Sequence, residues 1–377
     1  MNGGLHGLGG LRRHAHLGAT LAASTLRSPE LPFKLTVALT WRCHHRCACC
    51  GIWRRDKGEE LPAEAWARVF ASLPGLAWLD LTGGEPTART DFARVVASLN
   101  SGGLDEAGRG PGRSRPTRLA IAHFPTAGMV PQQAEAAARA LRWPGGPRVL
   151  VTVSFDGDRE LHDRLRGVVG AFDRAVETWQ RLRAVPGVQV VAGLTLQPGN
   201  VGQWRRIADA LCAALPGFEL ADLHANVLHR SPHYFGNLEA ATPDGAALVA
   251  DLRGIAAAKG ARRDPVQLIE RAYLALLPGY LQTGRSPLPC RSAELSAFVD
   301  PAGTVFACTI DPRPIGRLAD FNFDFAALWR SQSRLDLSRE VAADRCVGCW
   351  TPCEAYQTLL TQPRRTLLAW TGRALRA

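Results

Sequence analysis

The chain has 377 residues, of which 46% are hydrophobic and 21% charged, so it can bury a core and disorder is not expected. No apolar run reaches about 18 residues, which argues against a transmembrane helix. The net charge of +11 comes almost entirely from arginine, and either an acidic partner or genomic base composition accounts for it. The ten cysteines are too unevenly spaced for a small disulfide scaffold and indicate metal chemistry in a reducing cytoplasm.

In chain order, residues 1–32 are predicted to be an N-terminal extension, with either a short helix or a tail over 11–26. From residue 33, predicted strands alternate with predicted helices. The strands are 33–40, 76–82, 118–124, 148–155, 188–196 and 219–227, and the helices are 62–73, 91–99, 131–141, 170–182 and 201–215. This alternation indicates parallel βα units, and no dinucleotide-binding glycine fingerprint is present. We therefore predict an α/β fold, a partial (β/α)6 TIM-like barrel with functional groups at the carboxyl ends of its strands.

The remaining segments divide the chain further. A Gly-, Pro- and Arg-rich stretch over 101–116 is predicted to be a mobile surface insertion. The barrel is assigned to 33–230, one or two connecting helices to 231–289, a small α+β cysteine-rich module to 290–356 and a basic amphipathic tail to 357–377. Within the module, residues 296–300 and 304–308 flank Pro301-Ala302-Gly303 and are predicted to form a β-hairpin.

The first cysteine group lies in the loop after the first predicted strand and has the spacing C-x3-C-x2-C. Its members are Cys43, Cys47 and Cys50. A cubane iron–sulfur cluster takes four thiolates, so three in one loop leave one iron open for a non-protein ligand. A zinc site that recruits His44, His45 or Cys49 is the alternative; otherwise the two histidines are expected to face solvent and Cys49 to pack as a small apolar residue.

Two further motifs stand at strand ends in a fixed order: GGEP at 83–86 and SFDG at 154–157, with HDRLRG downstream at 162–167. Together with the cysteine loop, they make residues 33–230 resemble the radical S-adenosylmethionine (SAM) superfamily. The resemblance implies that the first cysteine group holds a [4Fe–4S] cluster whose fourth iron is chelated by SAM. It also implies reductive cleavage of SAM to a 5′-deoxyadenosyl radical that abstracts hydrogen from the substrate, with the cofactors carrying that chemistry.

The same resemblance assigns residues to SAM binding, and these are Gly83, Gly84, Glu85, Ser154, Arg166, Arg174 and Thr195. The two glycines allow close approach of the backbone to the methionine end, and Glu85 is expected to meet its ammonium group. Arg166 and Arg174 are alternative partners for its carboxylate, because a guanidinium matches a carboxylate in shape. Ser154 is expected near the carboxylate or ribose. Thr195 either borders the adenine or belongs to a plain core strand.

The second cysteine group lies in the C-terminal module, and its members are Cys290, Cys308, Cys346, Cys349 and Cys353. The interval from Cys290 through Gly303 to Cys308 resembles the start of the auxiliary-cluster domains called SPASM and, in a shorter form, twitch. A full SPASM domain has seven cysteines, so five indicate one auxiliary [4Fe–4S] cluster. Its predicted ligands are Cys290, Cys308, Cys346 and Cys349, while Cys353 replaces one of the last pair or stays a free thiol. A structural zinc site is the alternative.

We therefore expect a cytoplasmic radical SAM enzyme with one auxiliary cluster, a peptide or small-molecule natural-product substrate and a flavodoxin- or ferredoxin-like electron donor. An enzyme of cofactor biosynthesis acting on a tetrapyrrole is the alternative within this class. From other classes, a zinc-stabilised nucleic-acid binder is disfavoured by the GGEP and SFDG motifs, and an electron-transfer protein by the three-cysteine loop. No nucleic-acid partner is expected.

Three lesser expectations concern other residues. Cys212 is expected in the core. His224, His229, His233 and Tyr234 follow the sixth strand as candidate substrate contacts or polar loop residues. The basic tail either contacts a membrane surface peripherally or docks as a terminal helix on the barrel.

Overall fold

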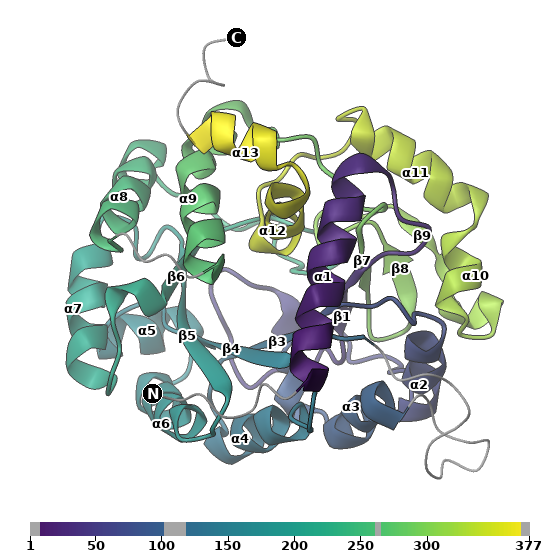
Figure 1. Cartoon of the computed structure of the whole chain (residues 1–377). Helices are drawn as coiled ribbons and strands as arrows, with labels where there is room; N and C mark the ends of the chain where they lie inside the picture. Colours follow the sequence, from purple (N-terminus) through teal and green to yellow (C-terminus); the bar gives the residue numbers. More distant parts are fainter. Residues whose placement is uncertain (1–7, 102–117, 261–264, 371–377) are drawn as a thin grey trace.

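The computed structural model describes residues 8–101, 118–260 and 265–370 as an α/β protein built on one curved sheet (Figure 1). The sheet has the strand order β6-β5-β4-β3-β2-β1-β7-β8-β9. The six predicted parallel strands of the partial barrel are confirmed. They are β1 (Lys34–Ala38), β2 (Trp78–Thr82), β3 (Ile121–Thr126), β4 (Arg148–Ser154), β5 (Val188–Leu196) and β6 (Leu223–Val227). The C-terminal strands are β7 (Ser296–Val299), β8 (Thr304–Phe306) and β9 (Pro314–Arg317).

The helices that follow the barrel strands lie along the outside of the sheet (Figure 1). They are α2 (Ala63–Ala71), α3 (Phe92–Ser101), α4 (Pro131–Ala140), α5 (Arg159–Arg166), α6 (Ala171–Arg183) and α7 (Trp204–Ala214). The others are α1 (Leu8–Leu26), α8 (Gly245–Ala258), α9 (Pro265–Thr283), α10 (Phe325–Trp329), α11 (Gln332–Ala342), α12 (Pro352–Thr361) and α13 (Pro363–Trp370). Short 3-10 turns occupy Ile52–Arg54, Pro86–Ala88, Leu220–Asp222 and Leu318–Phe321.

The two faces of the barrel strands differ in polarity, as the alternate residues of β4 show. Val149, Val151 and Val153 are fully buried against the outer helices, as parallel strands require. The alternate residues Thr152 and Ser154 face inward and remain partly exposed. The inner face is therefore polar and accessible to solvent, whereas the interior of a closed TIM barrel is usually filled by branched apolar side chains.

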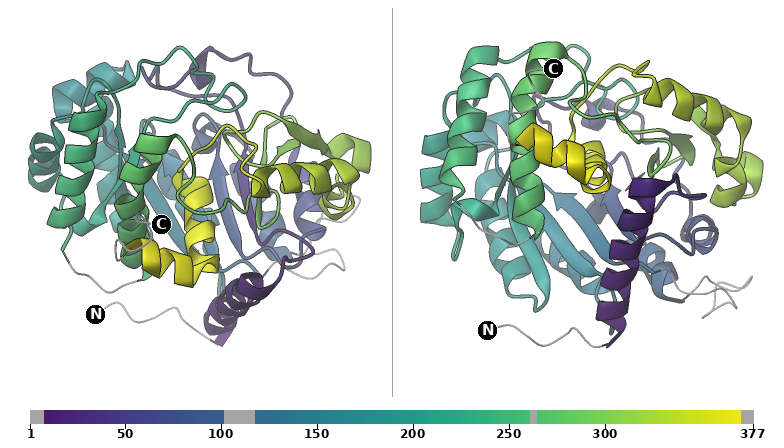
Figure 2. Two further views of the ribbon diagram at one scale, coloured as in Figure 1. Left: turned by 90° about the horizontal axis from the view of Figure 1, so that it is seen from above. Right: turned by 45° about the horizontal axis from the view of Figure 1, so that its top comes forward.

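The predicted hairpin of the C-terminal module is confirmed, because β7 and β8 pair antiparallel through Phe298 with Phe306 and Val299 with Val305. In addition, β7 pairs in parallel with β1, so the hairpin continues the barrel sheet. Figure 2 shows α8 and α9 on one side of the curved sheet and α10 and α11 on the other. The division into segments at 230 and 289 stays a prediction.

The structure adds helices that the sequence prediction lacked. Helix α5 begins after the N-cap Asp158, whose side chain accepts a hydrogen bond from the amide of Leu161. It ends at Gly167, which has the left-handed conformation with φ of 66°.

The prediction of a buried Cys212 is wrong, since this residue is exposed on α7. The predicted insertion at 101–116 lies, apart from the end of α3, outside the described residues.

Helix α1, the first of the described helices, packs beside α12, which lies near the end of the described residues. Helix α1 confirms the helical alternative for 11–26, and its Leu17 and Leu21 pack against Phe33, Ala77 and Leu295. Helix α12 contacts both α1 and α9 (Figure 1). Helix α13 contacts α9 and α12, yet Leu367 and Leu368 on it are 60% and 48% exposed. The rest of the predicted tail, residues 371–377, lies outside the described residues.

Candidate functional site

The loop that carries the first cysteine group is docked on the turn after β2 by backbone hydrogen bonds. The amide of Gly84 donates to the carbonyl of Thr40 at 2.8 Å, and the amide of Glu85 donates to that of Arg42 at 2.7 Å. A Cβ added at Gly83, where φ is 133°, would lie 2.2 Å from the Thr40 oxygen, and one at Gly84 would lie 2.3 Å from the Arg42 oxygen. Both positions therefore require glycine so that the cysteine loop can rest on this turn.

Helix α5 holds the same loop from its other side. The amides of Arg46 and Ala48 donate to the carbonyls of Arg166 and Leu165, both at 2.9 Å. These carbonyls stand at the C-terminus of α5, where a helix leaves carbonyl groups without partners. A Cβ on Gly167 would lie 2.6 Å from the Arg46 oxygen. The first cysteine group is thus fixed between the β2 turn and α5, at the carboxyl edge of the parallel strands.

The three thiols of this group are partly buried, and Arg166 is the cation that acts on all of them. Burial raises the pKa of Cys43 to about 11 and that of Cys50 to about 12, and it also raises the pKa of Cys47. The Arg166 Nη1 atom lies 3.8 Å from the Cys47 sulfur and favours its thiolate. Binding of a metal must therefore displace thiol protons, as is general for cysteine ligands.

The alternative zinc ligands of this loop lie in different settings. His44 is exposed, as predicted. The prediction that His45 faces solvent is wrong, because His45 is buried. Burial lowers the pKa of His45 to about 4. The Cys49 carbonyl accepts a hydrogen bond from the Asn237 side chain at 2.8 Å, and burial raises the pKa of its thiol.

Glu85 is buried and its carboxylate is already well supplied with donors. It accepts from the amide and hydroxyl of Thr87 at 3.3 and 2.7 Å, from the hydroxyl of Thr126 at 3.1 Å and from the amide of Ala127 at 2.8 Å. These bonds tie the β2 turn to the end of β3. Glu85 therefore stabilises the turn on which the cysteine loop rests.

Ser154, Thr195 and Arg166 are brought together around Asp156, which is 1% exposed. Arg166 Nη2 lies 2.8 Å from Asp156 Oδ2, and the amide of Thr195 donates to Asp156 Oδ1 at 3.1 Å. Ser154 ends β4 opposite Gly193 of β5. Asp156 was not among the predicted ligands, although the SFDG motif contains it, because its partners come from α5 and β5.

Arg174 stands apart from this cluster. It lies on α6, where it pairs with Glu177 at 2.7 Å and donates to the Met129 carbonyl at 3.4 Å. Of the two arginines predicted as alternatives, Arg166 is therefore the one that lies against the first cysteine group.

The inner face of the barrel carries a connected set of polar side chains beneath the cysteine loop. The Lys34 ammonium lies 3.1 Å from Asp80 Oδ2 and also donates to the carbonyl of Cys353. His123 contacts Asp80 Oδ1 at 3.2 Å and the Thr152 hydroxyl at 2.9 Å. Despite the burial of Asp80, Lys34 and His123 hold its pKa well below the ordinary value. This set joins β1 to β4 and links the barrel to the start of α12.

Four thiols of the second cysteine group act electrostatically on one another. Burial raises the pKa of Cys290 to about 12 and raises the pKa values of Cys308 and Cys349 well above the ordinary value. Neighbouring thiols also raise these values: Cys346 acts on Cys290 and Cys349, and Cys290 acts on Cys308 and Cys349. The Cys308 sulfur accepts the amides of Ile310 and Asp311 at 3.4 and 3.2 Å. Cys346 and Cys349 thus lie within electrostatic range of Cys290 and Cys308, and their assignment as a ligand tetrad stays a prediction.

Cys353 has a different environment. Burial raises its pKa to about 12, but the charges that act most strongly on it are those of Lys34 and Asp80 on the barrel strands. This setting distinguishes Cys353 from the other four members of the second cysteine group.

The residues 229–237 span the distance between the two cysteine groups. The Asn237 side chain donates hydrogen bonds to the carbonyls of Cys49 and His229. The His233 ring is hydrogen-bonded to the carbonyl of Cys308 at 3.0 Å. The His229 ring accepts a hydrogen bond from the amide of Trp350 at 3.3 Å. Tyr234 bonds the Thr82 hydroxyl at 2.6 Å. Burial lowers the pKa of His229 to about 4, so it stays neutral and supports the loops. Of the histidines predicted as candidate substrate contacts, His229 and His233 are thus hydrogen-bonded to backbone groups.

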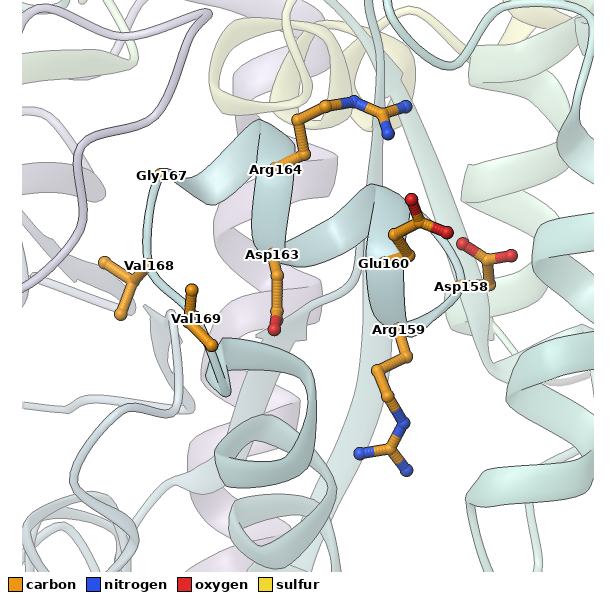
Figure 3. A pocket seen from close by; sticks show the side chains of 8 residues that line it. All are labelled: Asp158, Arg159, Glu160, Asp163, Arg164, Gly167, Val168 and Val169. Atoms are coloured by element: carbon orange, nitrogen blue, oxygen red, sulfur yellow. The ribbon is translucent and has the colours of Figure 1, made fainter.

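A hollow of about 780 Å³ lies on the outer side of α5 (Figure 3). It is lined by charged residues of α5 and by Val168 and Val169, of which Val169 is 93% exposed.

Among the described residues, no three His, Cys, Asp or Glu side chains are arranged compactly enough for a single metal ion. Around one zinc ion, thiolates at a Zn–S distance of about 2.3 Å crowd together. A four-iron cluster spreads its thiolates over the corners of a cube. The thiol sets therefore fit iron–sulfur clusters in the chemistry of their donors.

Comparison with known proteins gives a family match. The model of the radical SAM superfamily matches residues 37–211. The PqqA peptide cyclase of Methylorubrum populi is 39% identical over 77 residues, which cover 19% of this chain and 20% of that protein. The mycofactocin maturase MftC of Mycobacterium tuberculosis is 25% identical over 346 residues, or 88% of this chain and 78% of MftC. The first of these similarities thus spans about a fifth of the relative's length.

Solved structures agree in fold. Streptococcus suis SuiB bound to S-adenosylmethionine has a TM-score of 0.54 at 13% identity, covering 85% of this chain and 69% of SuiB. Native anSMEcpe with bound AdoMet has a TM-score of 0.56 at 12% identity, covering 92% of this chain and 100% of that one. At these identities the likeness concerns the fold. In the part of the chain that the structure describes, no helix has the length and apolarity needed to cross a membrane.

Proposed function

We propose that this chain, whose residues 37–211 match the radical SAM superfamily, binds a [4Fe–4S] cluster and SAM at the first cysteine group and modifies a peptide. The observation that carries the proposal is the position of Cys43, Cys47 and Cys50 in one loop, docked between the GGEP turn and α5. Three thiols at the open carboxyl edge of a parallel sheet leave a coordination position free for a substrate-derived ligand.

When bound, the cluster and SAM supply the one-electron chemistry that generates a radical able to take hydrogen from the substrate. The chain's own residues bind and orient. The cysteines bind as thiolates, and Arg166 favours that charge state at Cys47. Asp156 fixes both Arg166 and the Thr195 amide, which aligns the ends of β4 and β5. An ammonium group only donates hydrogen bonds, so the carbonyl oxygens of this turn would be its backbone acceptors, while the amides of Gly84 and Glu85 hold the cysteine loop.

The second cysteine group is proposed to bind one auxiliary [4Fe–4S] cluster through Cys290, Cys308, Cys346 and Cys349. The mutual influence of these thiols supports this set, and the proximity of Cys353 to Lys34 and Asp80 supports leaving it out. With four cysteine ligands the cluster has no open iron, so it would pass electrons or stabilise the module.

A peptide substrate is supported by the polar inner face of the barrel, on which Thr152, Ser154 and Asn226 are partly exposed. Two proteins with a similar fold have been solved with bound peptides: SuiB with its precursor peptide SuiA, and anSMEcpe with a Cp18Cys peptide. A flavodoxin- or ferredoxin-like electron donor and a cytoplasmic location complete the proposal.

The test is anaerobic incubation of the purified, iron-reconstituted protein with SAM and dithionite. The expected products are 5′-deoxyadenosine and methionine, measured by liquid chromatography. A protein that binds zinc at both cysteine groups and releases neither product would refute the proposal.

A further inference from the structure

We propose that Arg166 sets the reduction potential of the cluster at the first cysteine group and does not bind the SAM carboxylate. The inference rests on the proposed function, because it presupposes that this group holds a cluster. Its basis is the direction of the guanidinium, whose Nη1 lies 3.8 Å from the Cys47 sulfur while Nη2 lies 2.8 Å from Asp156.

The guanidinium is held in this position from several sides. The Arg166 carbonyl receives the amide of Arg46, so its backbone is part of the contact with the cysteine loop. Asp156, its ion-pair partner, is buried and is itself fixed by the amide of Thr195 in β5. The side chain of Arg166 is 12% exposed. Turning it toward a separate carboxylate would break a buried ion pair, which is costly because it leaves Asp156 without its counter-charge.

The charge of Arg166 reaches the whole cysteine loop. It is the arginine that acts on each of the thiols of Cys43, Cys47 and Cys50, and also on that of Cys49. Arg42 and Arg46 lie on the same loop but are exposed, so that solvent and salt screen them. Asp156 opposes the effect and is the stronger influence at Cys49, whereas at the predicted ligand Cys47 the influence of Arg166 is the larger.

The effect of Arg166 on the reduction potential of the cluster follows from its charge alone. Reduction adds one electron to the cluster, with no bond made or broken and no proton required, so the reduced state is the more negative one. A buried cation beside a thiolate ligand stabilises that state more than the oxidised one. Arg166 therefore raises the potential and makes the cluster easier to reduce. Removing the charge lowers the potential, and removing its counter-charge at Asp156 raises it.

The experiment is an anaerobic redox titration of the reconstituted protein without SAM, followed by electron paramagnetic resonance of the reduced cluster. Arg166→Gln is expected to lower the ratio of reduced to oxidised cluster about tenfold at a fixed potential, a shift of about 59 mV for one electron. Arg166→Lys is expected to shift less, and Asp156→Asn is expected to shift in the opposite direction. Arg164→Gln, on the exposed side of the same helix, is the matched control and is expected to leave the potential unchanged.

Equilibrium binding of SAM to the same variants separates this role from the alternative. We expect the affinity of Arg166→Lys for SAM to stay within about threefold of wild type. An unchanged potential in Arg166→Gln together with lost SAM binding would overturn the inference and favour the carboxylate role. If Arg166→Gln fails to load iron, the sign of the Asp156→Asn shift decides: a negative or absent shift refutes the inference. A wild-type protein without an iron–sulfur signal would instead refute the proposed function.

Discussion

The two cysteine groups differ in how the fold holds them and in the charge placed beside them. The first sits in a single loop whose backbone is docked on two neighbours, and the cation Arg166 lies 3.8 Å from its Cys47 sulfur. The second is gathered from the hairpin and from the distant segment 346–349, and the carboxylate of Glu354 acts on Cys290, Cys308 and Cys349. On the proposed assignment, three thiols from one loop leave one coordination position open, whereas four thiols from distant segments would close the second site and staple the module.

The largest effect is expected from Cys43→Ser. Loss of one of three thiolates leaves the first site unable to retain its cluster, so release of 5′-deoxyadenosine from SAM is expected to fall to background. Iron is expected to drop from about eight to about four atoms per chain. Cys212→Ser is the matched control, because Cys212 is exposed on α7 and distant in sequence from both groups. Retention of all iron in Cys43→Ser would contradict the assignment.

The second site is tested by comparing Cys346→Ser with Cys353→Ser. The first variant removes a member of the thiol tetrad and is expected to lose about four irons while the first site keeps its own. The second variant alters a thiol beside Lys34 and Asp80 and is expected to keep both clusters. Iron analysis and Mössbauer spectra measure the outcome. The reverse result, with loss in Cys353→Ser, would place Cys353 in the ligand set.

Lys34→Met tests the joint between the two regions. The Lys34 ammonium bonds Asp80 of the barrel and the Cys353 carbonyl and Gln357 side chain of α12. Removing it leaves Asp80 buried without its counter-charge, which should lower the free energy of unfolding by about 3 kcal/mol. Denaturant unfolding measures the change, and Lys34→Met combined with Asp80→Asn should recover part of it. Lys57→Met, which loses one hydrogen bond to the Trp53 carbonyl, is the control.

Gly84→Ala is expected to give the smallest change in global stability, about 2 kcal/mol, because the clash lies at one loop. The added Cβ would lie 2.3 Å from the Arg42 carbonyl oxygen, which displaces the cysteine loop. Iron at the first site should fall while the second site is unaffected. Gly75→Ala, where a Cβ meets nothing within 4 Å, is the matched control. Equal iron content in the two variants would show that the docking does not matter.

The sequence alone predicted those features of the two regions that short, continuous segments encode. The barrel strands follow from apolar runs, and the cysteine loop and GGEP turn follow from spacing within short segments. The pairing of β7 with β1 joins residues about 260 positions apart, and no local pattern encodes it. Helix α5 escaped prediction because it is short and polar, although Asp158 and Gly167 supply its capping signals. Without α5 the partners of Arg166 could not be inferred, so two arginines remained equivalent.

The central claim is that SAM cleavage belongs to the first cysteine group and not to the second. The most direct measurement is 5′-deoxyadenosine release by Cys43→Ala and Cys290→Ala under identical anaerobic conditions with dithionite. The account predicts no release from Cys43→Ala and measurable release from Cys290→Ala. Release from Cys43→Ala at the wild-type level would contradict it.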